Sequence, residues 1–350
     1  MKLGRRLIRG TLVLGMCLVV VSCGSVDQGP PTLAGPSIDD GVDSGINNEV
    51  TGGVGRIAYL RPSLTSGSIH IYLINPDGTN EVVVNDEADL ATYSAPSWSP
   101  DGTQIAFNSD RDGSANHNIY VMNVDGSNLR AIVEDTGGDF APSWSPDGQK
   151  ILFQAKRDNN TGWDIYVVDI DGSNEKMLIN TKLGTISLDD QLPTWSPDGS
   201  KVLFQAGLAS VGTDIYVANA DGSDIARVTS GSGRLHSHPS WSPDGSQIAF
   251  ESNLHQAVIL GAAPVAEYEL YVMDSDGGNV KRMTFEGNAN SQIQNPTWSP
   301  DGSQIAFEFT TVLSSTRITT IVVMRVDATN IYTIPNMPNG GFFPRWSPVP

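Results

Sequence analysis

The chain has 350 residues, with 39 acidic and 21 basic side chains, and a formal net charge of −18. A protein this acidic is repelled by phosphate backbones and by anionic lipid surfaces, so nucleic acid is disfavoured as a partner. A cationic or neutral partner, or a divalent cation, is compatible with the charge.

The first 22 residues have the pattern of a secretory signal peptide. A basic start (Lys2, Arg5, Arg6, Arg9) precedes an apolar run from 11 to 22. That run is too short to cross a bilayer, which takes about 20 residues. It ends in Val20-Val21-Ser22-Cys23, which resembles the bacterial lipobox, so we expect cleavage before Cys23 and lipidation of that cysteine. A plain secretory signal, or twin-arginine export, is the alternative.

Cleavage at this point has two consequences. The mature net charge becomes −22, because four positive charges are lost. The folded part contains no thiol or disulfide, because Cys17 and Cys23 are the only cysteines. Gly24 is not the aspartate that favours inner-membrane retention, which points to the outer membrane if the organism is Gram-negative. Residues 23–54 therefore comprise the lipidated cysteine and a Gly-, Pro- and Asp-rich tether, which as a flexible coil would span roughly 30 Å.

Internal repetition dominates the rest of the chain. The tripeptide Trp-Ser-Pro begins at Trp98, Trp144, Trp195, Trp241, Trp298 and Trp346. The intervals are 46, 51, 46, 57 and 48 residues, the period of four-stranded propeller blades. The first five copies continue into Asp-Gly.

Each repeat predicts four short strands. One leads into the tryptophan, and Pro-Asp-Gly supplies a tight turn. The second strand alternates large and small apolar residues, as in Ile105-Ala106-Phe107, and the third is almost wholly apolar, as in Ile119-Tyr120-Val121. A second Asp-Gly turn leads to a fourth strand, for example 129–133. No long helical pattern appears, so the class is all-β.

The two ends of the repeat region complement each other. Residues 56–60, 69–75 and 81–84 resemble strands two to four of a blade, and 342–346 resembles an isolated first strand. Their pairing would complete a six-bladed β-propeller over 55–350 and remove the exposed sheet edges.

The combined motif of Trp-Ser-Pro-Asp-Gly, Ile-Ala-Phe, Ile-Tyr-Val-Met and Asp-Gly-Ser-Asn resembles the propeller repeat of the TolB family. It differs from WD repeats, in which a Trp-Asp pair ends a strand after an upstream Gly-His. The resemblance implies a six-bladed propeller of the bacterial envelope that binds proteins. The founding member is soluble and periplasmic, carries an α/β domain before its propeller, and binds a peptidoglycan-associated lipoprotein and import machinery. This chain has a tether and a lipidation signal instead, so we transfer the fold and the protein binding but not the partner.

One turn departs from the repeat. Asp327-Ala328 replaces the second Asp-Gly turn of the last full repeat. If the backbone dihedral φ is positive there, we expect a strain of roughly 1 kcal/mol; otherwise the turn changes type.

We predict that binding takes place on the face opposite the Asp-Gly turns, where the loops vary in length and composition. Acidic links at 86–89, 134–139 and 189–190 would attract cations or remain simply solvated. The candidate binding rim comprises residues near the repeated prolines: Phe140, Gln191, His236, His238, Gln294, Asn295 and Phe342. The alternative is that these side chains only pack or hydrate the channel.

His236 and His238 form the only local histidine pair, and alternate strand residues point the same way, as a metal site requires. Some six-bladed lyases hold a divalent metal with channel histidines. We predict no metal, and keep this pair as the alternative. Asp169 and Asp171 resemble the start of a calcium loop, but the terminal glutamate is missing, so we interpret them as a hairpin turn.

No nucleophile elbow, metalloprotease motif or phosphate-binding loop is present in the sequence. We therefore predict a non-enzymatic, envelope-anchored lipoprotein without a cofactor, whose propeller binds a cell-envelope protein or peptide. One alternative is a metal-dependent polysaccharide lyase or hydrolase that uses the channel. Another is a purely structural or adhesive module, for which the outer blade surfaces would matter.

Overall fold

A computed structural model describes residues 55–63, 67–85, 91–113, 116–135, 137–157, 162–183, 186–208, 212–229, 234–255, 268–285, 291–313, 316–335, 337 and 340–348. The predicted signal peptide, Cys23 and the whole tether lie outside these residues. Within them, no helix is long and apolar enough to span a membrane.

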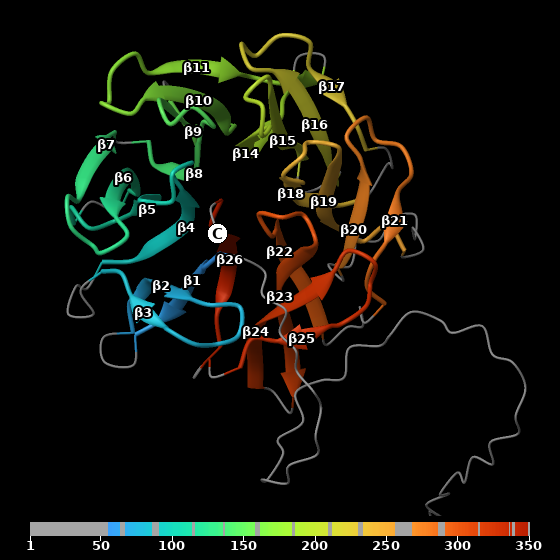
Figure 1. The fold of residues 1–350 in the computed structure, drawn as a ribbon. Coiled ribbons are helices and arrows are strands. Elements are labelled where there is room, and N and C mark those ends of the chain that lie inside the picture. Colours follow the sequence, from blue (N-terminus) through green and yellow to red (C-terminus); the bar gives the residue numbers. More distant parts are fainter. Residues whose placement is uncertain are drawn as a thin grey trace, which may run out of the picture. The chain divides into compact units, whose positions relative to one another are not determined.

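The described chain folds into six four-stranded antiparallel sheets, the blades of a β-propeller (Figure 1). We number the five continuous blades in chain order. Blade one contains β4 (Tyr93–Trp98), β5 (Gln104–Ser109), β6 (Asn118–Asn123) and β7 (Arg130–Val133). Blade two contains β8 (Asp139–Trp144), β9 (Lys150–Ala155), β10 (Asp164–Asp169) and β11 (Lys176–Ile179). Blade three contains β14 (Asp189–Trp195), β15 (Lys201–Leu208), β16 (Gly212–Asn219) and β17 (Ala226–Arg227).

The remaining strands complete the ring. Blade four contains β18 (His236–Trp241), β19 (Gln247–Ser252), β20 (Glu269–Asp274) and β21 (Lys281–Arg282). Blade five contains β22 (Ser291–Trp298), β23 (Gln304–Leu313), β24 (Thr316–Arg325) and β25 (Tyr332–Thr333). The closing blade contains β26 (Phe342–Trp346), β1 (Ile57–Pro62), β2 (Ile69–Ile74) and β3 (Val82–Val83). A two-stranded hairpin, β12 (Lys182–Leu183) with β13 (Ile186–Ser187), lies between blades two and three in sequence.

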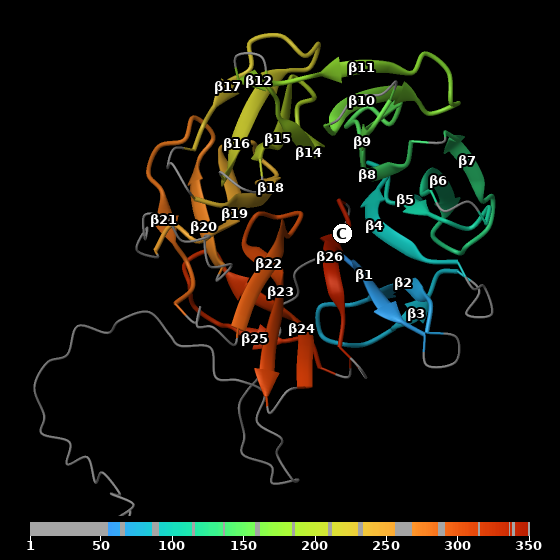
Figure 2. The ribbon, with the colours of Figure 1, turned by 180° about the vertical axis from the view of Figure 1, so that it is seen from behind.

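The tryptophan-bearing strand is innermost in every blade, as predicted. Figures 1 and 2 show β4, β8, β14, β18, β22 and β26 around the centre of the ring from its two sides. In each sheet this strand is an end strand, and the second, third and fourth strands follow outward.

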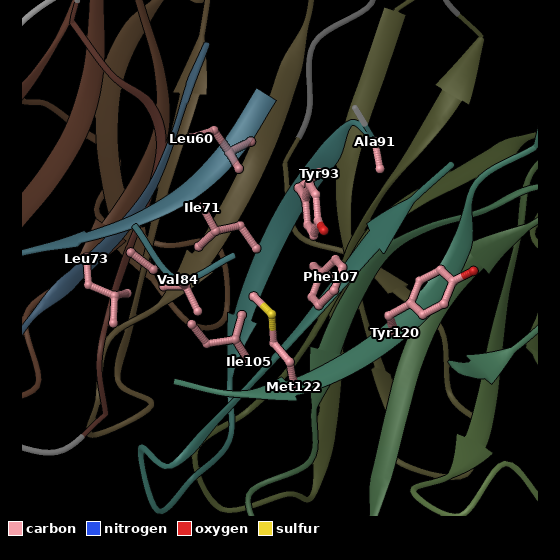
Figure 3. Packing of buried hydrophobic residues seen from close by; sticks show 11 residues of the cluster. Leu60, Ile71, Leu73, Val84, Ala91, Tyr93, Ile105, Phe107, Tyr120 and Met122 are labelled. Atoms are coloured by element: carbon pink, nitrogen blue, oxygen red, sulfur yellow. The ribbon is translucent and has the colours of Figure 1, made fainter. Parts of the chain in front are cut away.

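The core consists of apolar layers between neighbouring blades. In one of them, Leu60 and Ile71 of the closing blade meet Tyr93, Ile105 and Phe107 of blade one, and all five are almost completely buried (Figure 3). The alternation of the second strand places its isoleucine and its aromatic residue on one face, so both reach the same layer. Burial of each such side chain is worth about 1.5–3 kcal/mol.

The closing blade joins the two ends of the repeat region. Ile57 pairs with Trp346, Ala58 with Arg345 and Leu60 with Phe342. In addition, the Ser347 N–H donates to the Arg56 carbonyl at 2.7 Å, and the Arg56 N–H donates to Ser347 Oγ at 3.0 Å. The prediction of a sealed six-bladed propeller is therefore confirmed.

The Asp-Gly turns have the predicted geometry. In blade one, Gly102 has a φ of 69°, and Asp101 Oδ1 accepts from Ser99 Oγ at 2.6 Å and from the Thr103 N–H at 3.0 Å. Ala328 has a φ of 63°, and its N–H donates to the Arg325 carbonyl at 2.9 Å, as the Gly126 N–H does to Asn123 at 2.8 Å. This turn keeps its type, so Ala328 bears the left-handed strain that the sequence analysis expected.

Candidate functional site: the central channel

The channel widens into a cavity of about 520 Å³. Its walls are the Pro-Ser/Thr-Trp segments of the innermost strands together with the prolines of the following turns. Because those turns lie at one end of every blade, the cavity lies at the turn end of the channel. The binding face that we predict from the variable loops is at the opposite end.

All six innermost strands are bulged just before the cavity. The residue ahead of the repeated proline is not glycine, yet it has a positive φ in every blade: Ala95 (47°), Ala141 (52°), Leu192 (53°), His238 (48°), Asn295 (56°) and Phe343 (54°). The pairing register shifts at each of these points. Such a conformation costs on the order of 1 kcal/mol or more per residue and bends the strand.

A side chain of the preceding blade holds the bulge in place. The bulged N–H donates to the residue that follows the second-strand aromatic: Ala141 to Asn108 (3.3 Å), Leu192 to Gln154 (2.9 Å), His238 to Gln205 (3.2 Å), Asn295 to Glu251 (3.2 Å) and Phe343 to Glu308 (3.4 Å). Each bond crosses a joint between blades. At the sixth joint the equivalent residue is Leu60, which has no side-chain acceptor.

Two of these acceptors are buried carboxylates. Burial raises the pKa of Glu308, an effect that the Asn295 amide and the Phe343 N–H oppose and the nearby Glu251 charge reinforces. Glu251 Oε1 lies 2.8 Å from His238 Nδ1. Asn295, Glu251 and Glu308 therefore form one polar network between blades four, five and the closing blade.

The two predicted histidines do not face each other. His236 is 1% exposed, and its Nδ1 lies 2.9 Å from Ser252 Oγ, whereas His238 lies beside Glu251. The bulge begins at His238, whose positive φ ends the regular alternation on which the prediction of a shared direction rested. Among the residues that the structure describes, no group of three or more histidine, cysteine, aspartate or glutamate side chains is arranged to hold a metal ion.

The other predicted rim residues lie in separate environments. The Phe140 ring makes an edge contact with Trp163 at 5.3 Å, and Gln191 Oε1 accepts from Gln205 Nε2 at 3.0 Å. Phe342 lies against Phe343, with ring centroids 6.4 Å apart. Asn295 is buried, and Gln294 pairs with Glu308 across the sheet. Of the predicted set, only His238 lines the cavity. Binding by the others stays a prediction.

The acidic links differ from one another. Glu134 and Asp135 are exposed to solvent, residues 86–89 lie outside the described residues, and two other carboxyls are buried. Asp139 and Asp190 occupy equivalent positions in blades two and three and are both fully buried. Burial raises the pKa of Asp139 to about 6, although Arg157 lies 2.6 Å away. Burial raises the pKa of Asp190 to about 7, and the Thr181 N–H donates to this carboxyl at 2.6 Å. These carboxyls therefore belong to the packed interior.

Sequence reasoning missed two features of the channel. The acceptors Asn108, Gln154, Gln205, Glu251 and Glu308 all follow the second-strand aromatic directly, so a polar residue recurs at one repeat position. The second feature is Arg345, which stands where the other five innermost strands carry serine or threonine. Both signals appear when the repeats are aligned with one another.

The model of the TolB β-propeller domain matches residues 49–185 and 180–307. The chain belongs to this family. No curated protein sequence matches the chain.

Solved structures share the TolB-like fold. The structure of TolB from Acinetobacter baumannii is 24% identical, with a TM-score of 0.65, over 84% of this chain and 66% of that one. This chain thus spans slightly less than two thirds of that protein. A chain of a nidogen/laminin complex is 10% identical, with a TM-score of 0.59, over 83% of this chain and 98% of that one. An oligogalacturonate lyase in complex with manganese is 14% identical, with a TM-score of 0.50, over 81% of this chain and 75% of that one. At these identities the likeness shows the fold alone.

Proposed function

We propose that this chain is a lipid-anchored protein of the bacterial cell envelope, and that its TolB-like propeller is a non-enzymatic scaffold for a protein or peptide. The observation that supports this function best is the cavity of about 520 Å³ at the turn end of the channel, which six tryptophans and rings of proline line. Ligand sites are typically concave, largely apolar clefts of about 300–1,000 Å³ with a few polar groups.

Several features suit the cavity to an extended peptide. The wall residues come from six joined blades, so the cavity exists before a ligand arrives and little ordering entropy is lost on binding. Indole and pyrrolidine rings offer large apolar contact areas. Hydroxyl groups of Ser97, Ser143 and Thr194, among others, can hydrogen-bond to a peptide main chain.

Site-specific photocrosslinking in cells tests this function. A photoreactive residue at Ser143, in the cavity wall, should capture an envelope protein or peptide. The matched control is Met177, which is 53% exposed on the outer strand of the same blade. Capture from Met177 and not from Ser143 would support the adhesive alternative and contradict the channel.

The anchor is a separate part of the proposal. Replacement of Cys23 by serine should abolish labelling of the protein by a fatty-acid analogue, because the Cys23 thiol would be the point of lipid attachment. In a Gram-negative host we expect the lipidated form in the outer membrane. Equal labelling of the wild type and of the Cys23→Ser variant would rule out Cys23 as the site of lipid attachment.

A further inference from the structure

The cavity at the turn end has a charge opposite to that of the chain. The sequence contains 39 acidic residues, yet none of those that the structure describes lines this cavity. Among the described lining residues, the single arginine or lysine is Arg345. The aspartates of the Pro-Asp-Gly turns directly follow lining prolines such as Pro100 and Pro146, but they do not line the cavity themselves.

Arg345 departs from a sixfold pattern. The equivalent residues of blades one to five carry small hydroxyl groups: Ser97, Ser143, Thr194, Ser240 and Thr297. The closing blade replaces one hydroxyl of this ring with a long cationic side chain. The closure itself does not require the change, since Ala58 pairs with Arg345 through the backbone.

The guanidinium of Arg345 is not neutralised by the described part of the chain. Its Nη1 donates to the neighbouring Pro344 carbonyl at 2.8 Å, and its Cζ lies 5.8 Å from the centroid of the Phe343 ring. Among the described residues, no aspartate or glutamate forms an ion pair with it. Burial lowers the pKa of Arg345 to about 10, which leaves it charged at neutral pH. A partly desolvated cation without a counter-ion favours an anionic ligand.

We propose that the cavity binds an acidic peptide segment and that Arg345 pairs with its carboxylate, either of an acidic side chain or of the C-terminus. The guanidinium offers a planar pair of donors that matches a carboxylate. Five hydroxyl-bearing residues complete the ring at the same level. Two of them accept the backbone N–H of a tryptophan in the next blade, Ser97 from Trp144 at 3.3 Å and Thr297 from Trp346 at 3.4 Å. Each hydroxyl keeps its own hydrogen as a donor. This inference rests on the proposed peptide-binding function and specifies its ligand.

A peptide fits the walls better than a sugar acid or a phosphate. Apolar indole and proline surfaces surround a single cation, whereas a polyanionic chain would need several cations along the channel. The net charge of −18 repels acidic ligands at long range. Salt screens this repulsion over about 8–10 Å, but it screens a desolvated contact much less. The affinity of the cavity for an acidic peptide should therefore not fall as ionic strength rises.

Matched peptides provide the test. The probes are acetyl-Ala-Pro-Glu-Ala-amide and its glutamine analogue, titrated calorimetrically into the full mature protein. We expect the wild type to bind the glutamate peptide at least about tenfold more tightly than the glutamine peptide. This is the difference expected for one charge-assisted hydrogen-bonded pair. Arg345→Ser copies the other five blades and should abolish the preference, and Arg345→Lys should retain part of it. Arg317→Ser, on an exposed part of β24, is the control and should leave the preference unchanged.

The outcomes separate this inference from the function on which it rests. Equal binding of both peptides to the wild type and to Arg345→Ser would overturn the role of Arg345 while leaving a peptide channel. No binding of either peptide, together with Arg345-dependent binding of galacturonate or inorganic phosphate, would overturn the peptide assignment. Circular dichroism and thermal unfolding establish that each variant is folded; if Arg345→Ser does not fold, Arg345→Met, which keeps the apolar stem, replaces it.

Discussion

The closing blade and the five continuous blades share a backbone but differ in side chains. In a continuous blade a covalent turn joins the first two strands, and the Ser99 N–H donates to Gln104 at 2.9 Å. In the closing blade Ser347 makes the equivalent bond to Arg56 without that turn. The polar acceptor at the next joint, however, is replaced by Leu60, and the channel hydroxyl by Arg345. The residues that all six repeats share thus determine the backbone geometry. The residues that differ in the closing blade, Leu60 and Arg345, give it a different chemistry.

The largest effect should come from removing the closing strand. Deletion of residues 342–350 would uncover Ile57 and Tyr59, which pack against blade five and Trp346, and would expose the hydrogen-bonding edge of β1. We expect loss of the cooperative unfolding transition, because the cost would exceed much of the roughly 5–15 kcal/mol by which domains are stable. Thermal unfolding followed by near-ultraviolet circular dichroism measures this. A chain that lacks only residues 349–350 is the control, and a cooperative transition in the longer deletion would show that the ring does not depend on its closure.

Substitution of the turn glycine Gly126 should change the free energy of unfolding more than restoring glycine at position 328, where the repeat carries alanine. A Cβ on Gly126, where φ is 82°, would lie 2.2 Å from the Val84 carbonyl oxygen of the preceding blade. We expect Gly126→Ala to lower the free energy of unfolding by about 3 kcal/mol, through clash and left-handed strain together. Ala328→Gly, at the equivalent turn, should change it by less than about 1 kcal/mol, since relief of strain is offset by chain entropy. Urea denaturation compares the two, and equal effects would contradict the role assigned to the inter-blade contact.

Asp139 and Asp190 show that equivalent positions diverge within the continuous blades as well. Below pH 3.8 Asp190 is protonated in both the folded and the unfolded state; between 3.8 and about 7 only the folded state keeps the proton. Its contribution to stability therefore declines as pH rises from about 4 to 7 and stays low above that. We expect Asp190→Asn to raise the free energy of unfolding at pH 8 by on the order of 2 kcal/mol, with little change at pH 4.

Asp139→Asn is the comparison for that experiment. It removes the partner 2.6 Å from Arg157 and leaves a buried guanidinium with the less buried Asp135 and Glu175, so it should destabilise the protein at pH 8. Urea unfolding across the pH range measures both variants. A stabilising Asp139→Asn, or a pH-independent effect of Asp190→Asn, would mean that the two carboxyls do not differ as described.

Much of the architecture could be predicted because its determinants are local and repeated. The spacing of Trp-Ser-Pro fixed the number of blades, the Asp-Gly pairs located the turns, and the unpaired strands at each end required the closure. The left-handed strain at Ala328 followed from a single departure at a glycine position.

The site was less predictable because its backbone has no local signal. Residues such as Leu192 and Phe343 do not favour a positive φ, and the proline that follows favours extended backbone, yet the bulge imposes one. His238 lies in that bulge and contacts Glu251, whereas His236 contacts Ser252, so strand alternation could not predict where the two rings lie. Arg345 stands out only because the equivalent residues of the other five blades line the same cavity, and that arrangement arises from the tertiary structure.

The smallest effect should follow when the side-chain acceptor of a continuous blade is replaced by leucine, the residue type that the closing blade has at the equivalent position. Gln154→Leu puts the residue type of Leu60 where Gln154 Oε1 now accepts the Leu192 N–H at 2.9 Å. We expect a loss of about 1 kcal/mol, because an unsatisfied buried N–H costs about 1–3 kcal/mol and the burial of leucine offsets part of it. Gln154→Glu keeps an acceptor, as Glu251 and Glu308 do at their joints, and should restore protection of the Leu192 amide at a pH where the carboxyl is ionised. Amide hydrogen exchange resolves this single bond: faster exchange at Leu192 in Gln154→Leu alone would establish the bond as a joint between blades, and unchanged exchange would show that the bulge is held by the backbone on either side of it.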